Sequence, residues 1–300
     1  MKLAINIGCI LGRYVLEGSA AAAKRAGFDS MDYPLDAMVD PKNIFNQEDL
    51  YVGEAERIGK VAREGGVPIT QTHTPFVFRG WNDPTTYEEF IIPAIKRSVK
   101  VSAIMGADVA VVHPLHHFVY RGHEEEIFER NMEFYRSLIP ICKEYNIRVG
   151  IENMYQVDQR RKHIVHDTCS RKEEFVRYID TLDSEYMVAC LDTGHIGLPL
   201  QDDEPWDVIR ALGHDRLHAL HVHDNDYKSD SHKLPYMGTI NWNEVTKALG
   251  EIDYDGVFTY ESGILTGTMD EEIAPVALKY MADIGRHLCN LTDQSRPAKK

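Results

Sequence analysis

The sequence lacks the features that mark secreted, membrane-spanning and thiolate-zinc proteins. Its five cysteines are widely spaced and contain no Cys-x-x-Cys pair, so neither a thiolate zinc site nor a disulfide framework is predicted. No apolar run approaches the roughly 20 residues that a membrane span needs. The apolar segment 1–12 is short, and we interpret it as a first strand. This composition fits a protein of the reducing cytoplasm.

Positive charge is also scarce, because 33 Lys and Arg stand against 47 Asp and Glu, for a formal net charge of -14. Binding to nucleic acids or to anionic membranes needs clustered basic side chains. We therefore expect no nucleic acid partner and no membrane partner, whereas a homo-oligomer remains open. A glycine-rich phosphate loop is missing as well, because residues 8–12 lack the G-x-G-x-x-G spacing of a dinucleotide-binding open sheet.

Short strand-like segments alternate with helical segments along the whole chain. Strands are predicted at residues 3–8, 28–33, 68–73, 108–113, 147–152, 187–192, 217–223 and 256–261. Helices are predicted at residues 17–26, 47–64, 87–105, 124–145, 171–182, 206–212, 242–249 and 270–288. Strict alternation implies a parallel sheet with right-handed crossovers. Eight such units predict a single α/β domain, a (β/α)8 TIM barrel over residues 1–290, followed by a flexible tail at 291–300.

Metal-binding side chains stand at the ends of the last six predicted strands. The active site of a TIM barrel lies at the C-terminal ends of its strands. The strand-end residues are His73, His113, Glu152, Asp192, His221 and Glu261. His195 follows the sixth strand closely, and Asp230 and His232 lie in the loop after the seventh. These groups should therefore meet at one mouth of the barrel.

Two of these carboxylates, Glu152 and Glu261, follow apolar strand residues directly. Burying a carboxylate there is costly unless it is paired or coordinated to a metal. The residues two positions before the ligand-type groups on the same inward face are small: Gly150, Cys190, Ala219 and Thr259. The pattern predicts a packed interior below a polar mouth that holds a divalent metal.

Five motifs carry a resemblance to a known family: IEN at 151–153, LDTGH at 191–195, HVHDN at 221–225, DSH at 230–232 and YES at 260–262. In this order they resemble the xylose isomerase-like TIM barrel superfamily of sugar phosphate isomerases and epimerases. The resemblance implies one divalent metal, most often Mn²⁺, with Mg²⁺, Co²⁺ or Zn²⁺ as alternatives. It would be held by Glu152, Asp192, His221 and Glu261. Ligation by carboxylates and imidazole without thiolate is consistent with Mn²⁺.

The same resemblance implies an isomerase or epimerase that acts on a sugar, keto-sugar or sugar phosphate. The metal would stabilise an enediolate, and Glu152 and Glu261 would act as acid/base groups on opposite sides of the substrate. His195 would contact a substrate oxygen. Beside a leaving group the same parts would catalyse elimination, so the alternative is a lyase or dehydratase acting on a keto-polyol or keto-glycoside.

Four further residues exceed what a single-metal ketose 3-epimerase needs: His73, His113, Asp230 and His232. They would be substrate contacts or ligands of a second metal. They also complete the nine-residue pattern of apurinic endonucleases of the endonuclease-four type, which bind three zinc ions. The acidic composition argues against a nuclease, because a DNA-repair enzyme must bind phosphates.

Specificity residues are harder to assign. Ketose 3-epimerases carry a Glu six residues beyond the strand-five ligand and an Arg six beyond the strand-seven His, whereas this chain has Asp158 and Tyr227 there. A standard free-ketose 3-epimerase is therefore disfavoured. Trp81 could form part of a lid or pack on a neighbouring subunit, and Arg161 could bind a substrate anion or belong to a solvated charge run. No role is assigned to His223.

Overall fold

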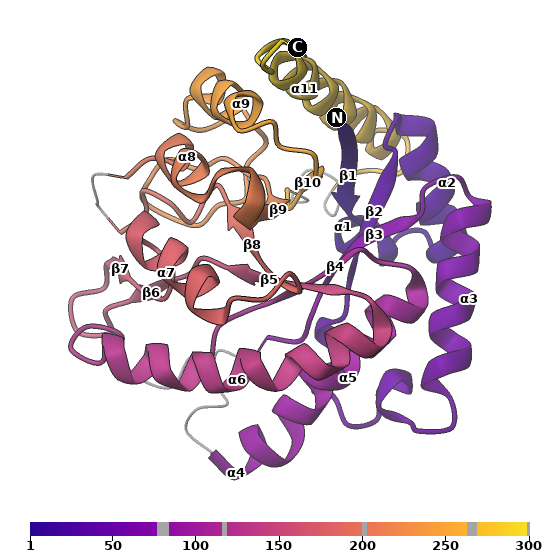
Figure 1. The fold of residues 1–300 in the computed structure, drawn as a ribbon. Coiled ribbons are helices and arrows are strands. Elements are labelled where there is room, and N and C mark those ends of the chain that lie inside the picture. Colours follow the sequence, from indigo (N-terminus) through magenta and orange to yellow (C-terminus); the bar gives the residue numbers. More distant parts are fainter. Residues whose placement is uncertain (77–83, 116–118, 200–202, 263–268, 299–300) are drawn as a thin grey trace.

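The computed structural model describes all residues except 77–83, 116–118, 200–202, 263–268 and 299–300. Its main sheet has eight parallel strands in the order β10-β1-β2-β3-β4-β5-β8-β9, surrounded by helices (Figure 1). A parallel bridge between Val222 and Tyr260 joins the two end strands, and Val222 N donates to Thr259 O at 2.9 Å. The sheet thus closes on itself, which confirms the predicted (β/α)8 barrel.

The strands of the barrel agree with the predicted segments to within a few residues. They are β1 (Lys2–Asn6), β2 (Ser30–Pro34), β3 (Ile69–His73), β4 (Val109–Val112), β5 (Arg148–Glu152), β8 (Met187–Asp192), β9 (Leu217–His221) and β10 (Val257–Tyr260). Their residues are largely buried, as expected for parallel strands covered by helices. Strands β1, β4, β8 and β10 are mainly apolar, whereas β3 buries Thr70, Gln71 and Thr72.

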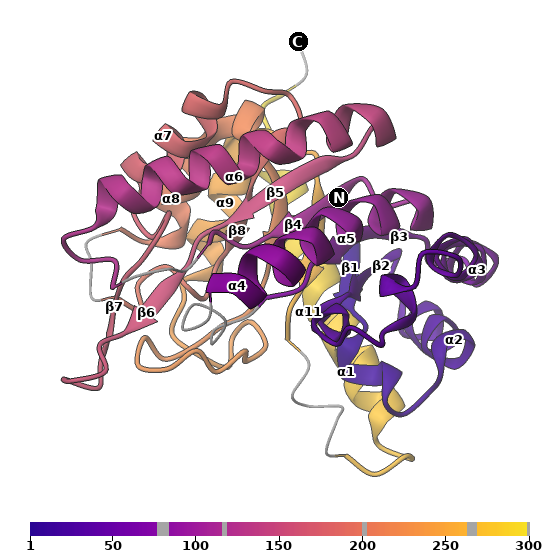
Figure 2. The same ribbon diagram turned by 90° about the horizontal axis from the view of Figure 1, so that it is seen from below.

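The helices that cover the barrel are α1 (Gly8–Leu11), α2 (Leu16–Ala26), α3 (Tyr51–Glu64), α4 (Pro84–Thr86), α5 (Ile92–Met105), α6 (Glu124–Tyr145), α7 (Lys172–Leu182), α8 (Pro205–Arg216), α9 (Trp242–Glu251) and α11 (Ala274–Gln294). Short 3-10 turns η1 (Asp36–Val39) and η2 (Ile44–Asn46) and a π-helical turn η4 (Tyr87–Ile91) complete the elements. Figure 2 shows the helices along the outside of the strands.

Three local features differ from the predicted pattern. The segment between β5 and α7, for which the sequence predicted neither strand nor helix, contains an antiparallel hairpin of β6 (Tyr155–Val157) and β7 (Ile164–His166). The predicted first strand ends earlier, and α1 begins at Gly8. Helix α11 continues to Gln294, past the predicted domain boundary, because Leu291 packs on the core and Thr292 is buried.

The barrel interior below the strand ends is filled by small side chains. Val109, Val111, Cys190 and Ala219 form one buried cluster. A Cβ atom added to Gly150 would lie 3.0 Å from Val109 Cγ1 and 3.1 Å from Cys190 Cβ. Glycine is therefore needed at this level, and the packed interior supports the polar groups above it.

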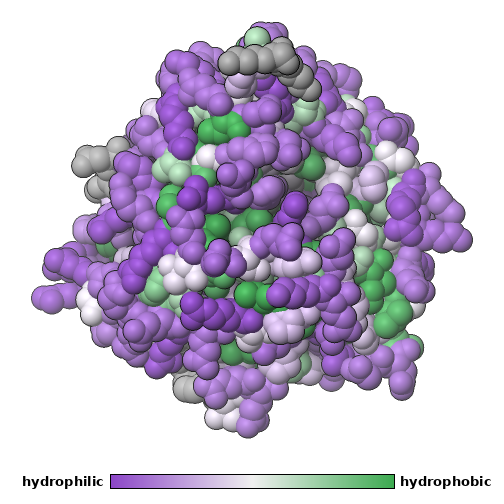
Figure 3. Space-filling view, viewed as in Figure 1, coloured by the Kyte–Doolittle hydropathy of each residue, from purple (hydrophilic) through white to green (hydrophobic). Residues whose placement is uncertain are grey.

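The exterior is mainly polar on the face shown in Figure 3, with hydrophobic residues emerging in scattered groups. Within the described residues, no helix combines the length and the apolar character that crossing a membrane requires.

Candidate metal centre

Four of the predicted ligands meet at the C-terminal mouth of the barrel: Glu152, Asp192, His221 and Glu261. We call these four residues the central cluster. Each offers one ligand-type atom, and these atoms all lie within 4.8 Å of one another. His221 Nδ1 lies 3.0 Å from Glu152 Oε1 and 3.5 Å from Glu261 Oε2. Strands β5, β8 and β9 end at the first three residues, and Glu261 follows β10, so the strand ends themselves position the cluster.

The two glutamates of the central cluster differ in their electrostatic surroundings. Burial alone would raise the pKa of Glu152, but His221 and His113 hold that pKa well below its usual value. Burial raises the pKa of Glu261, and the Glu152 carboxylate adds to this effect although His221 opposes it. In the metal-free chain Glu152 is therefore the more readily ionised of the two glutamates.

Two histidines, His73 and His113, flank the central cluster on the side of β3 and β4. His113 Nε2 lies 3.1 Å from Glu152 Oε2 and 3.1 Å from His73 Nε2. His73 also lies 3.8 Å from a carboxylate oxygen of Glu152 and 3.8 Å from one of Glu261. The Phe76 ring covers His113, with ring centroids 4.1 Å apart. The structure thus brings both predicted histidines to the cluster.

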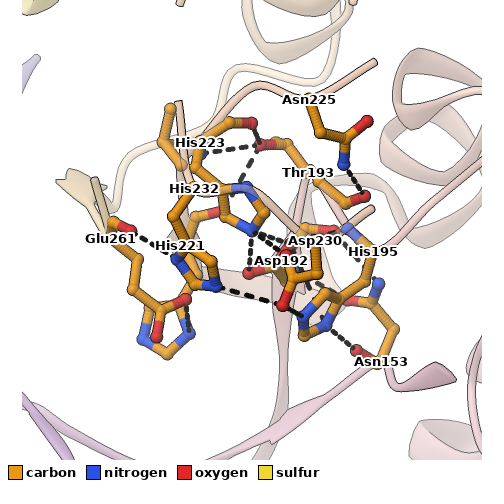
Figure 4. A network of polar contacts seen from close by, with 12 residues as sticks. Asn153, Asp192, Thr193, His195, His221, His223, Asn225, Asp230, His232 and Glu261 are labelled. Carbon is orange, nitrogen blue, oxygen red and sulfur yellow. Dashed lines mark hydrogen bonds and ion pairs between the residues drawn. The ribbon is translucent and has the colours of Figure 1, made fainter. Parts of the chain in front are cut away.

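On the other side lie His195, His223, Asp230 and His232, which we call the loop flank (Figure 4). Asp230 Oδ2 lies 3.1 Å from His232 Nε2 and 3.6 Å from His195 Nε2. Asp192 joins this flank to the central cluster, because its Oδ1 accepts a hydrogen bond from His195 N at 2.8 Å. That bond also fixes the turn that follows β8.

His223 belongs to this site although the sequence assigned it no role. It is fully buried, its Nε2 lies 3.0 Å from Asp192 Oδ1, and its ring stacks on that of His232 with centroids 4.0 Å apart. A Cβ atom at Gly194 would lie 1.9 Å from His223 Cε1, so the glycine of LDTGH makes room for this imidazole. Asp32, also unassigned, lies buried beneath His221. The sequence feature that could have identified Asp32 is a carboxylate within a strand predicted to be buried.

The loop after β9 is anchored by Asp224, which is fully buried. The Asp224 carboxylate accepts hydrogen bonds from Gly238 N at 3.1 Å, Ile240 N at 3.1 Å and Trp242 Nε1 at 2.8 Å. Its backbone also pairs with Lys233. These bonds fold the loop back over the mouth, which places Asp230 and His232 against the site.

We expect Trp242→Phe to lower the free energy of unfolding by about 1–3 kcal/mol, because it leaves a buried carboxylate one donor short. Urea unfolding followed by circular dichroism measures this change. Trp206→Phe is the matched control, since the Trp206 indole donates no hydrogen bond within the described residues. Equal loss of stability in both variants would contradict the anchoring role of Asp224.

The predicted specificity residues lie apart from this cluster or outside the described residues. Asp158 and Arg161 form an ion pair of 2.9 Å with each other at the exposed turn of the β6–β7 hairpin. Tyr227 donates to Glu204 Oε2 at 2.7 Å. Trp81 lies outside the described residues. Tyr155, on the same hairpin, instead reaches the site and donates to Asp230 Oδ2 at 3.0 Å.

The donor set fits a divalent metal. The ion pairs that reach the carboxylates of Glu152, Asp192, Asp230 and Glu261 in the described residues all come from histidines. Buried carboxylates need a compensating charge. Although burial opposes it, anionic neighbours raise the pKa of His195, His221 and His232, so protons on these imidazoles supply that charge in the metal-free chain, and a divalent cation would supply it in their place. Oxygen and imidazole donors without thiolate suit Mn²⁺, Mg²⁺ or Zn²⁺. The central cluster is therefore the place where such an ion would bind.

Fold and site together define a (β/α)8 barrel with histidines and carboxylates gathered at the C-terminal ends of its strands. A sequence model of the xylose isomerase-like TIM barrel family matches residues 20–284, and the chain belongs to that family. This confirms the resemblance drawn from the five motifs.

Relatives of the chain include sugar epimerases and dehydratases, which supports an enzyme of this superfamily. A D-psicose 3-epimerase of Enterocloster bolteae is 29% identical over 139 residues, 46% of this chain and 41% of the relative. A mannonate dehydratase of Oceanobacillus iheyensis is 26% identical over 156 residues, 48% of this chain and 42% of the relative. The matches span 62%, 56% and 41% of the first three curated relatives, less than two thirds of each.

Solved structures share the fold over nearly the whole chain. A crystal structure of a D-tagatose 3-epimerase-like protein matches with a TM-score of 0.73 at 20% identity, covering 98% of this chain and 99% of the other. At this identity the likeness establishes the shared fold.

Proposed function

We propose that the chain is a divalent-metal-dependent isomerase or epimerase that acts on a sugar or keto-sugar by proton transfer next to a carbonyl group. The observation that carries this proposal is the pairing of Glu152 and Glu261 around His221 Nδ1, at 3.0 and 3.5 Å. The two carboxylates come from strands that are not neighbours in the barrel, so they can address a substrate from different sides.

The chain's own residues supply the proton transfers. Glu152, ionised beside His221 and His113, accepts the proton from the carbon next to the carbonyl, and Glu261 holds and returns a proton. A cation held by the central cluster, with Mn²⁺ as the expected metal, would withdraw electrons from the carbonyl and make that proton easier to remove. His195 Nδ1 lies 2.8 Å from Asn153 O, and its Nε2 lies 3.6 Å from Asp230 Oδ2, so a substrate oxygen would meet this nitrogen beside Asp230.

A cavity of about 360 Å³ adjoins the central cluster and is the expected place for the sugar. Its lining includes Asn6, Asp36, His73 and Glu261. The polar side chains in this lining match the hydroxyl groups of a carbohydrate.

Solvent exchange tests the function directly. We expect the protein loaded with Mn²⁺ to catalyse deuterium incorporation from D₂O into at least one member of a panel of ketoses, ketose phosphates and inososes. Removing the metal with EDTA should reduce the rate at least 100-fold, and adding Mn²⁺ should restore it. Mass spectrometry measures the exchange. Absence of exchange on every compound would contradict the proposed mechanism.

A dehydratase or lyase is the second candidate, and the matches to mannonate dehydratases favour it. Elimination begins with removal of the same type of proton, and it differs because water or another group then leaves. The exchange panel separates the two, because a lyase consumes its substrate and releases a dehydrated product. An abasic-site DNA duplex belongs in the same panel, and we expect no incision, because the chain carries a net charge of -14.

A further inference from the structure

His221 is surrounded by carboxylates on both edges of its ring. Its Nδ1 faces Glu152 and Glu261 at 3.0 and 3.5 Å. Its Nε2 faces Asp32 Oδ2 at 3.7 Å and makes no hydrogen bond within the described residues. The imidazole and the Asp32 carboxylate are both fully buried. The ring therefore has one edge turned to the central cluster and the other to a single buried carboxylate.

The two nitrogens must play different parts if His221 binds a cation. Nδ1 lies among the other members of the central cluster, so Nδ1 is the atom that would donate its electron pair. A neutral imidazole that donates through Nδ1 carries its proton on Nε2. That proton needs an acceptor in a place where water has no access.

Asp32 is placed to be this acceptor. It lies on β2, and its neighbour in the sheet register is Asn6 of β1. Asn6 Nδ2 donates to Asp32 Oδ2 at 3.1 Å and holds the carboxylate in place, while Asp32 Oδ1 makes no hydrogen bond within the described residues. The ion pair that reaches Asp32 there comes from His221. A buried carboxylate without a cationic side chain is costly, so a structural role alone accounts poorly for it.

We propose that Asp32 is a positioning residue that receives Nε2–H of His221 and so keeps Nδ1 free for a divalent cation. The proposal rests on the metal site of the proposed function. A carboxylate behind a metal-binding histidine fixes the tautomer and the ring orientation, and its removal typically weakens metal binding 10–100-fold.

Metal affinity in the absence of substrate gives the first test. Isothermal titration of the metal-free protein with Mn²⁺ is expected to show about 10–100-fold weaker binding for Asp32→Ala than for the wild type. Asp32→Asn should lose less, because its amide oxygen still accepts a hydrogen bond. Asp29→Asn is the control, since Asp29 pairs with Arg286 and has no contact with His221.

The second test measures the protonation of the His221 imidazole directly. In protein labelled with ¹⁵N-histidine and loaded with diamagnetic Zn²⁺, we expect His221 to show a protonated, slowly exchanging Nε2 in the wild type. In Asp32→Ala this proton should exchange with solvent much faster. A loss of stability elsewhere in the protein would not produce such a local change at His221.

The outcomes separate this inference from the proposed function. If the wild type binds no divalent ion, both are wrong. If the wild type binds Mn²⁺ and both Asp32 variants bind it equally well, with an unchanged Nε2 proton, only the role of Asp32 is wrong. If Asp32→Ala does not fold, the affinity and spectrum of Asp32→Asn decide.

Discussion

Glu152→Gln is expected to slow deuterium exchange into the active substrate by about 10³-fold or more. The substitution keeps the size of the side chain but removes a base, and loss of a general base alone typically costs 10²–10⁴-fold. It also removes the charge that faces His221 and His113, at 3.0 and 3.1 Å. Mass spectrometry of the compound that the wild type exchanges measures the effect.

Two further variants sharpen this prediction. Glu185→Gln changes an exposed carboxylate beside the cavity at the opposite end of the barrel, and it should exchange like the wild type. Glu261→Gln should form little epimer. It should nevertheless retain part of the deuterium exchange, because Glu152 can still remove the proton from the face of the substrate that it contacts. Near-normal exchange in Glu152→Gln would exclude Glu152 as the base.

The second large effect is expected from a single added methyl group. In Gly194→Ala the new Cβ would lie 1.9 Å from His223 Cε1 and 2.3 Å from His223 Nδ1, so the imidazole must move. Forcing a side chain out of a packed position costs about 1–3 kcal/mol. Because His223 also contacts Asp192, its displacement should weaken Mn²⁺ binding at least tenfold.

Thermal unfolding and Mn²⁺ titration check both consequences. Gly12→Ala is the matched control, because a Cβ at that position meets no heavy atom within 4 Å. If Gly194→Ala unfolds and binds Mn²⁺ like the control, the close contact with His223 does not constrain the site.

The barrel and the central cluster could be predicted because their signals are local and repeated. Most of these strands are apolar and followed by a turn, and a functional group at the end of an apolar strand stands out against its neighbours. Glu152 after Val-Gly-Ile and Asp192 after Ala-Cys-Leu are examples. The closure of the sheet then brings such strand ends together without any further information.

The remaining parts of the site depend on contacts between distant residues. His223 has the same side-chain type as His218, yet one is buried against Asp192 and the other hydrogen-bonds near the strand start. Asp32 can be assigned to the site only through its contact with His221, a residue that lies far away in the sequence. The β6–β7 hairpin was hidden because its two short strands flank the polar segment 158–163. Neither the periodicity of apolar residues nor the amino-acid composition indicates which distant residues contact one another.

The place of β10 between β9 and β1 has a consequence for the order of events during synthesis. Strand β1 leaves the ribosome first, but its partner β10 begins only at Val257. Until then β1 and β9 are open sheet edges, which invite pairing with other chains. The last ligand of the central cluster, Glu261, arrives at the same moment. Barrel closure and completion of the central cluster thus both depend on the last strand, and a nascent chain halted before residue 257 would have neither.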